Sequence, residues 1–280
     1  MNTKKILSML LAGATCAAML AGCGNTATKP EDTTTPTDTA DTSAASNSDL
    51  AYVKENGKMI IGYTVYEPMN YTDENGEFTG FDTEFAKAVC EKLGVEPEFQ
   101  EIVWDTKNVE LEAKNIDCIW NGMTITDDLK ENIAVSDAYA QNTQVVITTT
   151  ANKDTYADFA NLEGKTVAVE AGSAAQSLAE EDEHLKNAEI VTVGKQTDAL
   201  LEVKSGTADA AIFDQTLADS ILGKGDYADL TTCGVFHKEE YGIGFRKDSD
   251  LCTEVNKIMA DLKADGTLQT LADKYGLTLA

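Results

Sequence analysis

Short apolar stretches alternate with amphipathic ones from residue 58 to the end of the chain. Runs rich in β-branched and aromatic residues predict strands over 58–64, 98–103, 116–120, 144–149, 166–170, 190–193, 210–213, 231–237 and 242–245. Apolar residues at helical spacing predict helices over 81–93, 106–114, 174–181, 197–204 and 215–222, and two closing helices on either side of Gly266 and Thr267. Strands that alternate with helices are typical of parallel sheets with helical crossovers.

The strand–helix alternation occurs twice, which predicts an α/β fold of two lobes with a central cleft. The run 144–149 is placed to leave the first lobe, and the run 231–237 is placed to return to it. We therefore expect a first lobe made of residues 50–142 and 234–280. The second lobe, 143–233, is inserted in the first, and the two crossing strands form a hinge.

The first 49 residues lack this alternation. Two lysines precede an apolar run over 6–20 that is too short for a comfortable membrane span, which predicts an export signal over 1–22. The sequence LAGC at 20–23 is similar to a bacterial lipobox, in which the cysteine, here Cys23, becomes the lipidated first residue. The alternative is an ordinary secretory peptide with an incidental cysteine. Residues 23–49 are mostly Thr, Ala, Asp, Ser and Pro, which predicts a disordered tether.

The chain is strongly acidic. It has 22 Lys and Arg residues against 48 Asp and Glu residues, a formal net charge of −26. Such a surface repels nucleic acid and anionic lipid head groups, so neither is an expected partner. Acidic surfaces are also simply soluble, so the charge excludes partners more firmly than it identifies one.

The cysteines and histidines do not form a metal-binding pattern. His184 and His237 are isolated, and no CxxC pair occurs among the cysteines beyond Cys23, which are Cys90, Cys118, Cys233 and Cys252. No metal site or cofactor is therefore expected. Outside the cytoplasm a 90–118 or 233–252 disulfide is open to the chain, and buried free thiols are an equal alternative.

The segment 117–137, DCIWNGMTITDDLKENIAVSD, is the most informative part of the sequence. A strand predicted to end at Trp120 leads into the polar run 121–124, and a helix begins after Thr126, which can cap it. Ligands of open α/β sheets bind at the carboxyl ends of strands, where free amides and small polar side chains converge. A rim of hydroxyl, amide and backbone N–H groups suits a small polar solute better than a macromolecule.

This segment resembles, together with five others, the extracellular solute-binding proteins of polar amino-acid ABC importers. The others are GYTVYEPMNY at 62–71, GFDTEFAKAV at 80–89, LEGKTVAVEAGS at 162–173, ADAAIFD at 208–214 and YGIGFRKDSDL at 241–251. The resemblance covers the chain from about residue 50 to the C-terminus, with the blocks in the family's order. It implies a periplasmic-binding-protein-like (Venus-flytrap) architecture that closes on a small-molecule ligand.

The resemblance also implies a set of ligand-binding residues, namely Tyr66, Asn121, Gly122, Thr124 and Asp214. Tyr66 would pack on the solute, the positions within 121–124 would bind its amino and carboxylate groups, and Asp214 would bind its ammonium group. Tyr66 could instead be a core residue, although its turn position beside Pro68 favours partial exposure. Asp214 could instead cap the following helix.

Three further candidates follow from their places at strand ends. Gly172 and Ser173 occupy a strand-to-helix turn, where free amides can hold a carboxylate. Trp104 ends its strand and is a candidate second apolar wall of the cleft. Trp120 is expected to face opposite to Asn121 by strand alternation, so core packing and ligand contact are both open for it.

One position departs from the family pattern. Five residues beyond Thr124 the family usually has an arginine that clamps the ligand's α-carboxylate with two parallel hydrogen bonds, and here that position is Leu129. Leucine supplies neither charge nor donors, and the adjacent Lys130 points about 100° around the helix. Either amides and hydroxyls hold the carboxylate alone, or the ligand is not a simple α-amino acid.

The preferred function is a lipid-tethered, monomeric receptor on the outer face of a bacterial membrane. It would capture a small polar solute, with an amino acid as the expected ligand, and deliver it to an ABC permease. The first alternative is a secreted, dehydratase-like enzyme on the same scaffold, against which the scarcity of acid–base residues argues. A sensor lobe would need a membrane-spanning segment and a signalling domain, and a surface adhesin would need an exposed aromatic patch.

Overall fold

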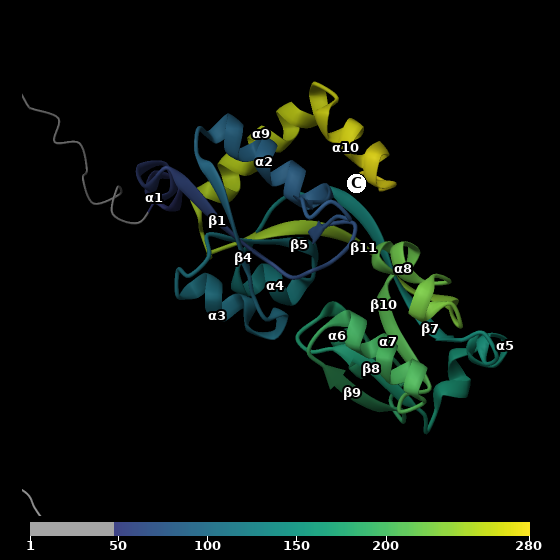
Figure 1. Cartoon of the computed structure of the whole chain (residues 1–280). Coiled ribbons are helices and arrows are strands. Elements are labelled where there is room, and N and C mark those ends of the chain that lie inside the picture. The colour runs from purple at the N-terminus through teal and green to yellow at the C-terminus, as the bar shows by residue number, and fades with distance from the viewer. Residues whose placement is uncertain (1–47) are drawn as a thin grey trace, which may run out of the picture. The chain divides into compact units, whose positions relative to one another are not determined.

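A nine-stranded mixed sheet runs through residues 48–280, the part of the chain that the computed structural model describes (Figure 1). Its strands follow the order β4 (Glu96–Glu101), β1 (Lys58–Tyr63), β5 (Cys118–Thr124), β11 (Leu230–Phe245), β7 (Ala140–Thr149), β10 (Ala210–Asp214), β8 (Thr166–Glu170) and β9 (Glu189–Val193), and β6 (Ala134–Val135) pairs with β11. The predicted signal peptide, Cys23 and nearly all of the predicted tether lie outside the described residues.

Two parallel groups of strands make up this sheet, and two antiparallel strands join them. Strands β4, β1 and β5 are parallel, and so are β10, β8 and β9, whereas β7 and β11 run antiparallel to their neighbours in both groups. We name the β4-β1-β5 group with its helices the first lobe, and the β10-β8-β9 group with its helices the second lobe. The predicted α/β, two-lobe class is confirmed. The residue-level lobe boundaries stay a prediction.

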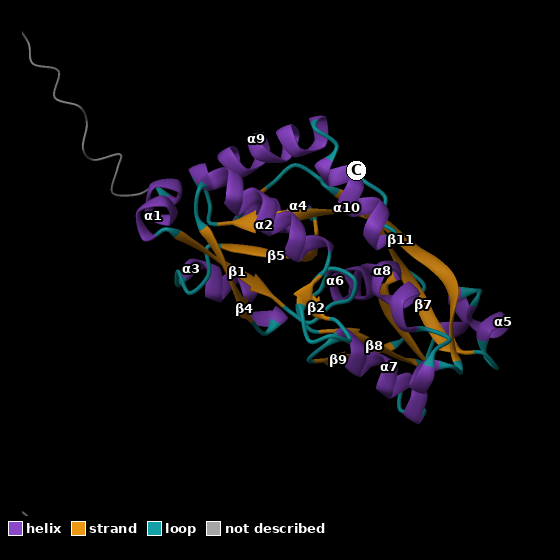
Figure 2. Cartoon of the chain, turned by 45° about the horizontal axis from the view of Figure 1, so that its top comes forward, coloured by secondary structure: helices purple, strands orange, loops and turns teal. Residues whose placement is uncertain are grey.

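The first lobe carries the two longest helices of the described residues. Its helices are α1 (Asp49–Asn56), α2 (Phe81–Leu93), α3 (Lys107–Glu112), α4 (Asp127–Asn132), α9 (Asp250–Ala264) and α10 (Thr267–Tyr275), with a 3₁₀ turn η2 (Trp104–Thr106). Helices α2, α9 and α10 contact one another and lie side by side in two views (Figures 1 and 2). A two-stranded hairpin of β2 (Tyr71–Thr72) and β3 (Phe78–Thr79) precedes α2.

The second lobe has four helices of 4 to 10 residues. They are α5 (Lys153–Tyr156), α6 (Ala174–Glu181), α7 (Gln196–Ser205) and α8 (Gln215–Ile221), with 3₁₀ turns η3 (Phe159–Leu162) and η4 (Gly225–Tyr227). An apolar cluster under α6 joins Val146 of β7 to Val167 and Val169 of β8. Residues of α6 and β10 belong to the same cluster, so it fixes the positions of the polar residues at the ends of these two elements.

Helix α2 shows how local sequence fixes an element that supports the site. Its residues Phe81, Phe85 and Val89 are fully buried, as their spacing predicts, and Gly94 ends the helix in the left-handed conformation with φ +76°. Phe85 packs edge-on against Trp120 of β5, with ring centroids 4.8 Å apart. Helix α2 thereby holds β5 in place from its buried face.

Two strands continue well beyond a predicted end. Strand β5, expected to end at Trp120, continues to Thr124 because its second half pairs with β11, with Tyr241 opposite Thr124. The predicted runs 231–237 and 242–245 are one strand, β11, of 16 residues. The polar residues between those runs face the cleft, so they interrupt the apolar pattern without interrupting the strand. Strand β11 shifts register against β7 between Thr232 and Gly234.

A buried ion-pair network attaches α1, which the sequence pattern did not predict, to the first lobe. The Arg246 side chain is 10% exposed, and its Nε donates to both carboxylate oxygens of Asp49 at 3.0 Å. Its Nη2 donates to Asp117 at 3.1 Å, and its Nη1 donates to the carbonyl of Ile116 at 2.7 Å. The start of the described chain is thus held to the strand that leads into the site.

Residues 48–280 contain four cysteines, for which disulfides and free thiols were both expected alternatives. All four cysteines of this part are free thiols, and Cys90, Cys118 and Cys252 are buried, so the thiol alternative is the one the structure has. No described helix is both long and apolar enough to cross a membrane.

Candidate functional site

A cavity of about 700 Å³ lies between the lobes, and residues of both lobes line it. Seven of the eight predicted ligand-binding residues are in its walls: Trp104, Asn121, Gly122, Thr124, Gly172, Ser173 and Asp214. Leu129 of α4 lines it as well. A more open groove of about 1330 Å³ adjoins it, sharing Thr124 and Ala174 and adding Asn142 and Glu239. The structure therefore brings residues that are far apart in sequence to one place.

Tyr66 is the predicted residue that does not line this cavity. It is only 3% exposed, so the expected partial exposure is wrong. Its N–H donates to the carbonyl of Asn70 at 2.8 Å in a tight turn, and this turn directs the ring inward. Its hydroxyl lies 2.6 Å from that of Tyr241. A Cβ on Gly122 would lie 2.8 Å from the Tyr66 ring, so Tyr66 supports the cavity wall from behind.

Asn121 and Gly122 shape the wall while their own polar groups face the protein. The Asn121 amide donates to Thr64 Oγ1 at 2.7 Å and its Oδ1 accepts from the Thr64 N–H at 3.0 Å. The Gly122 N–H donates to Asp82 Oδ2 at 2.7 Å, and its φ of +57° favours glycine. Trp120 is fully buried and packs on Phe85, as the core alternative predicts.

Trp104 and Gly172 bring the two walls together. Trp104, in η2, is 8% exposed, and the Lys107 ammonium lies 4.8 Å from its ring centroid. The same ammonium donates to the Gly172 carbonyl at 2.6 Å. A Cβ on Gly172 would lie 2.8 Å from the Cα of Asp105, so this approach of the two lobes requires glycine.

The turn at Gly172 and Ser173 has the predicted strand-to-helix form, but two of its donors are already used. The Gly172 N–H donates to Gln176 Oε1 at 2.9 Å. The Ser173 hydroxyl caps α6 by accepting from the Gln176 N–H, and it donates to the Glu170 carbonyl at 2.7 Å. These two groups hold the turn in shape.

Asp214 occupies the N-cap position of α8, yet its side chain makes no capping hydrogen bond, so the capping alternative is wrong. Its carboxylate instead accepts hydrogen bonds from three other elements. Donors to Oδ1 are Asn142 Nδ2 at 2.5 Å, Gln144 Nε2 at 2.7 Å and the Tyr241 hydroxyl at 3.1 Å, and the Gln196 amide donates to Oδ2. Asp214 is 6% exposed and lines the cavity.

Glu239 is a second buried acid beside Asp214 that the sequence analysis missed. Its Oε1 accepts from Asn142 Nδ2 at 2.6 Å and Gln144 Nε2 at 3.0 Å, the same two amides that bind Asp214. The Thr124 hydroxyl donates to it at 2.9 Å. Strand alternation places Glu239 on the face of Tyr241, which would have been visible had β11 been recognised as one strand.

The electrostatics of the cavity follow from burial. Burial raises the pKa of Asp214 well above its usual range, and the charge of Glu239 raises it further. Burial also raises the pKa of Glu239. The pKa of Glu170 is raised to about 8, first by burial and then by the charge of Asp214. Burial lowers the pKa of Lys107. The site therefore favours neutralisation of its acids, by protons or by a bound cation.

Metal binding has no obvious place within residues 48–280. No described group of three or more His, Cys, Asp or Glu side chains is arranged to hold a metal ion.

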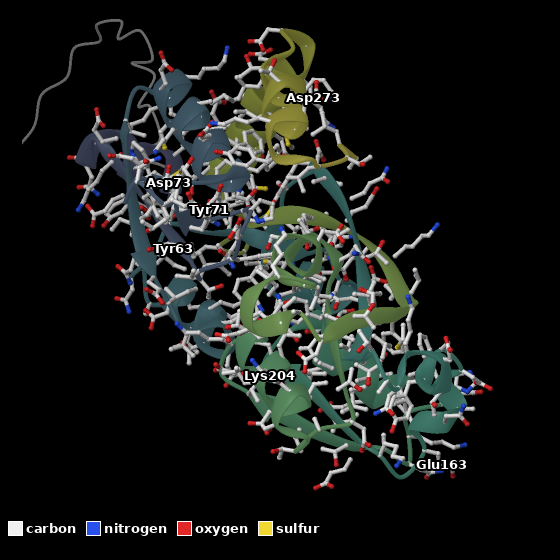
Figure 3. The ribbon with its side chains drawn as sticks, turned by 45° about the vertical axis from the view of Figure 1, so that its right-hand side comes forward. Tyr63, Tyr71, Asp73, Glu163, Lys204 and Asp273 are labelled. Atoms are coloured by element: carbon white, nitrogen blue, oxygen red, sulfur yellow. The ribbon has the colours of Figure 1, made fainter. Side chains whose placement is uncertain are left out.

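The second lobe carries the exposed residues Glu163 and Lys204 at its periphery, remote from the first lobe's Tyr63 and Asp73 (Figure 3).

Comparison with known proteins supports the resemblance seen in the sequence. The model of the family described as bacterial extracellular solute-binding proteins, family 3, matches residues 59–278. The histidine-binding periplasmic protein of Salmonella typhimurium is 31% identical over 242 residues, which cover 83% of this chain and 92% of that protein.

Solved structures agree with it in fold. A mutant of ArgBP from T. maritima has a TM-score of 0.74 at 33% identity, covering 81% of this chain and 98% of its own. The ancestral amino acid-binding protein AncCDT-1, a precursor of cyclohexadienyl dehydratase, has a TM-score of 0.73 at 32% identity, covering 81% of this chain and 99% of its own.

Proposed function

We propose, since the chain belongs to the family 3 bacterial extracellular solute-binding proteins, that it captures a small solute bearing an amino group between its lobes. The solute is then delivered to an ABC permease. Amino acids are the first ligands to test, because similar proteins are named for binding histidine, arginine and cystine. The protein acts as a monomer, lipid-anchored outside the cytoplasm through Cys23, and binds its solute without turning it over.

The buried carboxylate of Asp214 carries this proposal. It lines the cavity, and donors from β7, β11 and α7 hold it in one orientation. A carboxylate that is fixed and shielded from water is a strong partner for an ammonium group, because charge-assisted hydrogen bonds are stronger at low local dielectric. A solute that brings such a group offsets the cost of burying the acid.

Closure of the lobes is the second part of the proposal. Two strands, β7 and β11, pass from one lobe to the other, and we infer that they form the hinge between a first lobe of 50–142 and 234–280 and a second lobe of 143–233. A solute held by Asp214 on one side and contacted by the Trp104 wall on the other would favour the closed state.

An enzyme on this scaffold is the alternative function. We consider an enzyme because the chain is similar to AncCDT-1, a precursor of cyclohexadienyl dehydratase. We favour binding, because Asp214 and Glu239 both accept hydrogen bonds from the amides of Asn142 and Gln144. The third titratable side chain bound to this pair, Tyr241, is fully buried behind it. Incubation of the protein with each solute it binds, followed by NMR of the solute, would reveal turnover.

Calorimetry with Asp214→Asn tests the receptor proposal. The substitution keeps the shape of the side chain and removes its charge, so the affinity for an amino-bearing solute should fall by about 30-fold or more. The probes are the twenty L-amino acids and simple diamines. The matched control is Asp226→Asn, because the Asp226 side chain is 93% exposed and pairs only with Lys204 at the periphery of the second lobe (Figure 3).

The wild-type protein and Asp226→Asn should bind alike. Binding that Asp214→Asn leaves intact would remove Asp214 from the site. A wild-type protein that binds no member of the panel would overturn the receptor proposal itself.

A further inference from the structure

The chemistry of the cavity walls bears on which amino-bearing solute fits. We propose that the site selects positively charged amines or guanidines and does not require an α-carboxylate, with Glu239 serving beside Asp214 as a second anionic binding group. This inference rests on the proposed function and narrows its ligand class.

Eight donor groups in the walls of the cavity are already engaged in hydrogen bonds within the protein. The N–H groups of Gly122 and Gly172 donate to Asp82 and Gln176. The other engaged donors are the hydroxyls of Thr124 and Ser173, the amides of Asn121, Gln144 and Gln196, and the ammonium of Lys107. A carboxylate is an acceptor only, so it could bind one of these eight groups only by displacing an existing hydrogen bond.

The buried polar atoms that lack a partner at the site are acceptors. They are Oε2 of Glu239, Oε1 of Gln144 and Oδ1 of Asn108, and the latter two residues line the cavity. A buried acceptor without a partner costs free energy until a donor reaches it. A primary ammonium brings three N–H donors and a guanidinium brings five, so a cationic amine supplies what the walls lack.

The charges along the cavity have the same sign. Six of its lining residues are acidic: Asp105, Asp127, Asp128, Glu170, Glu181 and Asp214. Lys107 is the one basic residue that lines this cavity. Its ammonium already donates to the Gly172 carbonyl and lies over the Trp104 ring. At the α4 position where the family usually has an arginine, Leu129 lines the wall. A bound carboxylate would meet like charges and no free cation, which is unfavourable at low dielectric.

Glu239 makes the acid pair different from a single ammonium-binding residue. Asp214 and Glu239 are held side by side because Asn142 and Gln144 donate to both. An ammonium placed against this pair can donate to both carboxylates, and it relieves the repulsion between them. We therefore expect the pair to bind a ligand with a net positive charge more tightly than a neutral zwitterion.

Matched ligand pairs test this inference by calorimetry on the full protein. L-Arginine and agmatine differ by the α-carboxylate alone, as do L-lysine and cadaverine. We expect agmatine and cadaverine to bind at least as tightly as the amino acids. Leu129→Arg should then turn the preference towards the amino acids by about tenfold or more, because it restores a bidentate carboxylate partner.

Glu239→Gln tests the second anionic group. It should weaken agmatine and cadaverine binding by about tenfold or more. Glu163→Gln is the matched control, because Glu163 is exposed at the periphery of the second lobe and lines neither the cavity nor the groove (Figure 3). Circular dichroism of each variant establishes that it folds. If Glu239→Gln does not fold, the wild-type ligand pairs decide.

The outcomes separate the two proposals. If the wild-type protein binds either amino acid more tightly than its decarboxylated partner, the inference is overturned and the receptor function stands. Unchanged amine affinity in folded Glu239→Gln also overturns it. If neither amines nor amino acids bind, both the inference and the receptor proposal fail.

Discussion

The ammonium of Lys107, at the start of α3, lies 2.6 Å from the carbonyl oxygen of Gly172, at the turn between β8 and α6. The two residues belong to opposite lobes and both line the cavity, so this hydrogen bond joins its two walls. A second, exposed contact joins Lys195 of the second lobe to Glu101 of the first at 3.2 Å. The buried Lys107 bond is the stronger candidate for holding the lobes together without a ligand, because exposed pairs contribute little.

Lys107→Met should make the ligand-free protein more open. The substitution removes a charged hydrogen bond worth about 1.5–3 kcal/mol and keeps an unbranched, flexible apolar side chain at this position. Small-angle X-ray scattering of the ligand-free protein should show a larger radius of gyration than for wild type. Lys204→Met is the control, since Lys204 pairs with Asp226 at the periphery of the second lobe. An unchanged scattering profile for Lys107→Met would contradict this role.

Asp82→Asn should flatten the pH dependence of stability. Burial raises the pKa of Asp82 from 3.8 to about 7, although hydrogen bonds from the Gly122 N–H and the Tyr139 hydroxyl oppose the shift. The folded protein then binds a proton that the unfolded chain has released, so stability falls as the pH rises from about 4 to about 7. The penalty amounts to roughly 4 kcal/mol above that range.

Urea unfolding at a series of pH values measures this effect. The wild-type protein should lose stability across the interval, and Asp82→Asn should lose much less, because asparagine has no proton to release. Equal slopes in the two proteins would mean that other groups dominate.

Arg246→Met should destabilise the first lobe. Arg246 binds the buried carboxylates of Asp49 and Asp117, and its removal would leave both without their cation. Loss of one partner from a buried ion pair costs about 3–5 kcal/mol. Urea unfolding should therefore show a midpoint shifted to lower concentration. Lys58→Met, which breaks the exposed pair with Glu98, should change the midpoint little.

Cys23→Ser should release the protein from the membrane. Cys23 follows Leu20-Ala21-Gly22 in the predicted lipobox, and its lipid is the proposed attachment. A tether over 23–49 would span roughly 25–30 Å, enough to reach a membrane partner. Fractionation of cells that express the variant should find it outside the membrane fraction. Its retention there would place the attachment elsewhere.

Local signals predicted the elements that sequence neighbours determine. Helix α2 has its predicted bounds because its apolar spacing and Gly94 are both local, and Thr126 caps α4 as expected, accepting from the Leu129 N–H. The extension of β5 depends on pairing with β11, more than a hundred residues later, and no local pattern records that pairing. Propensity yields to tertiary pairing there.

Local signals likewise predicted only part of the candidate site. Asp214 was found because it ends a strand in a recognisable block, and the structure places it in the cavity. Glu239 was missed because its importance comes from the amides of Asn142 and Gln144, which belong to the neighbouring strand β7. The burial of Tyr66 was not predicted for a similar reason, since the hydroxyl that its buried ring meets is that of Tyr241, 175 residues later.

Strand β11 is one continuous strand paired with β5 at one end and β7 along most of its length. A strand that is hydrogen-bonded in both lobes cannot slide along its neighbours. Any rotation of one lobe relative to the other must therefore bend or twist the strand. The register against β7 breaks between Thr232 and Gly234 and again between Val235 and His237. Such irregularities leave a ladder locally weaker, so we expect the bending that would accompany the proposed closure to concentrate in residues 232–237.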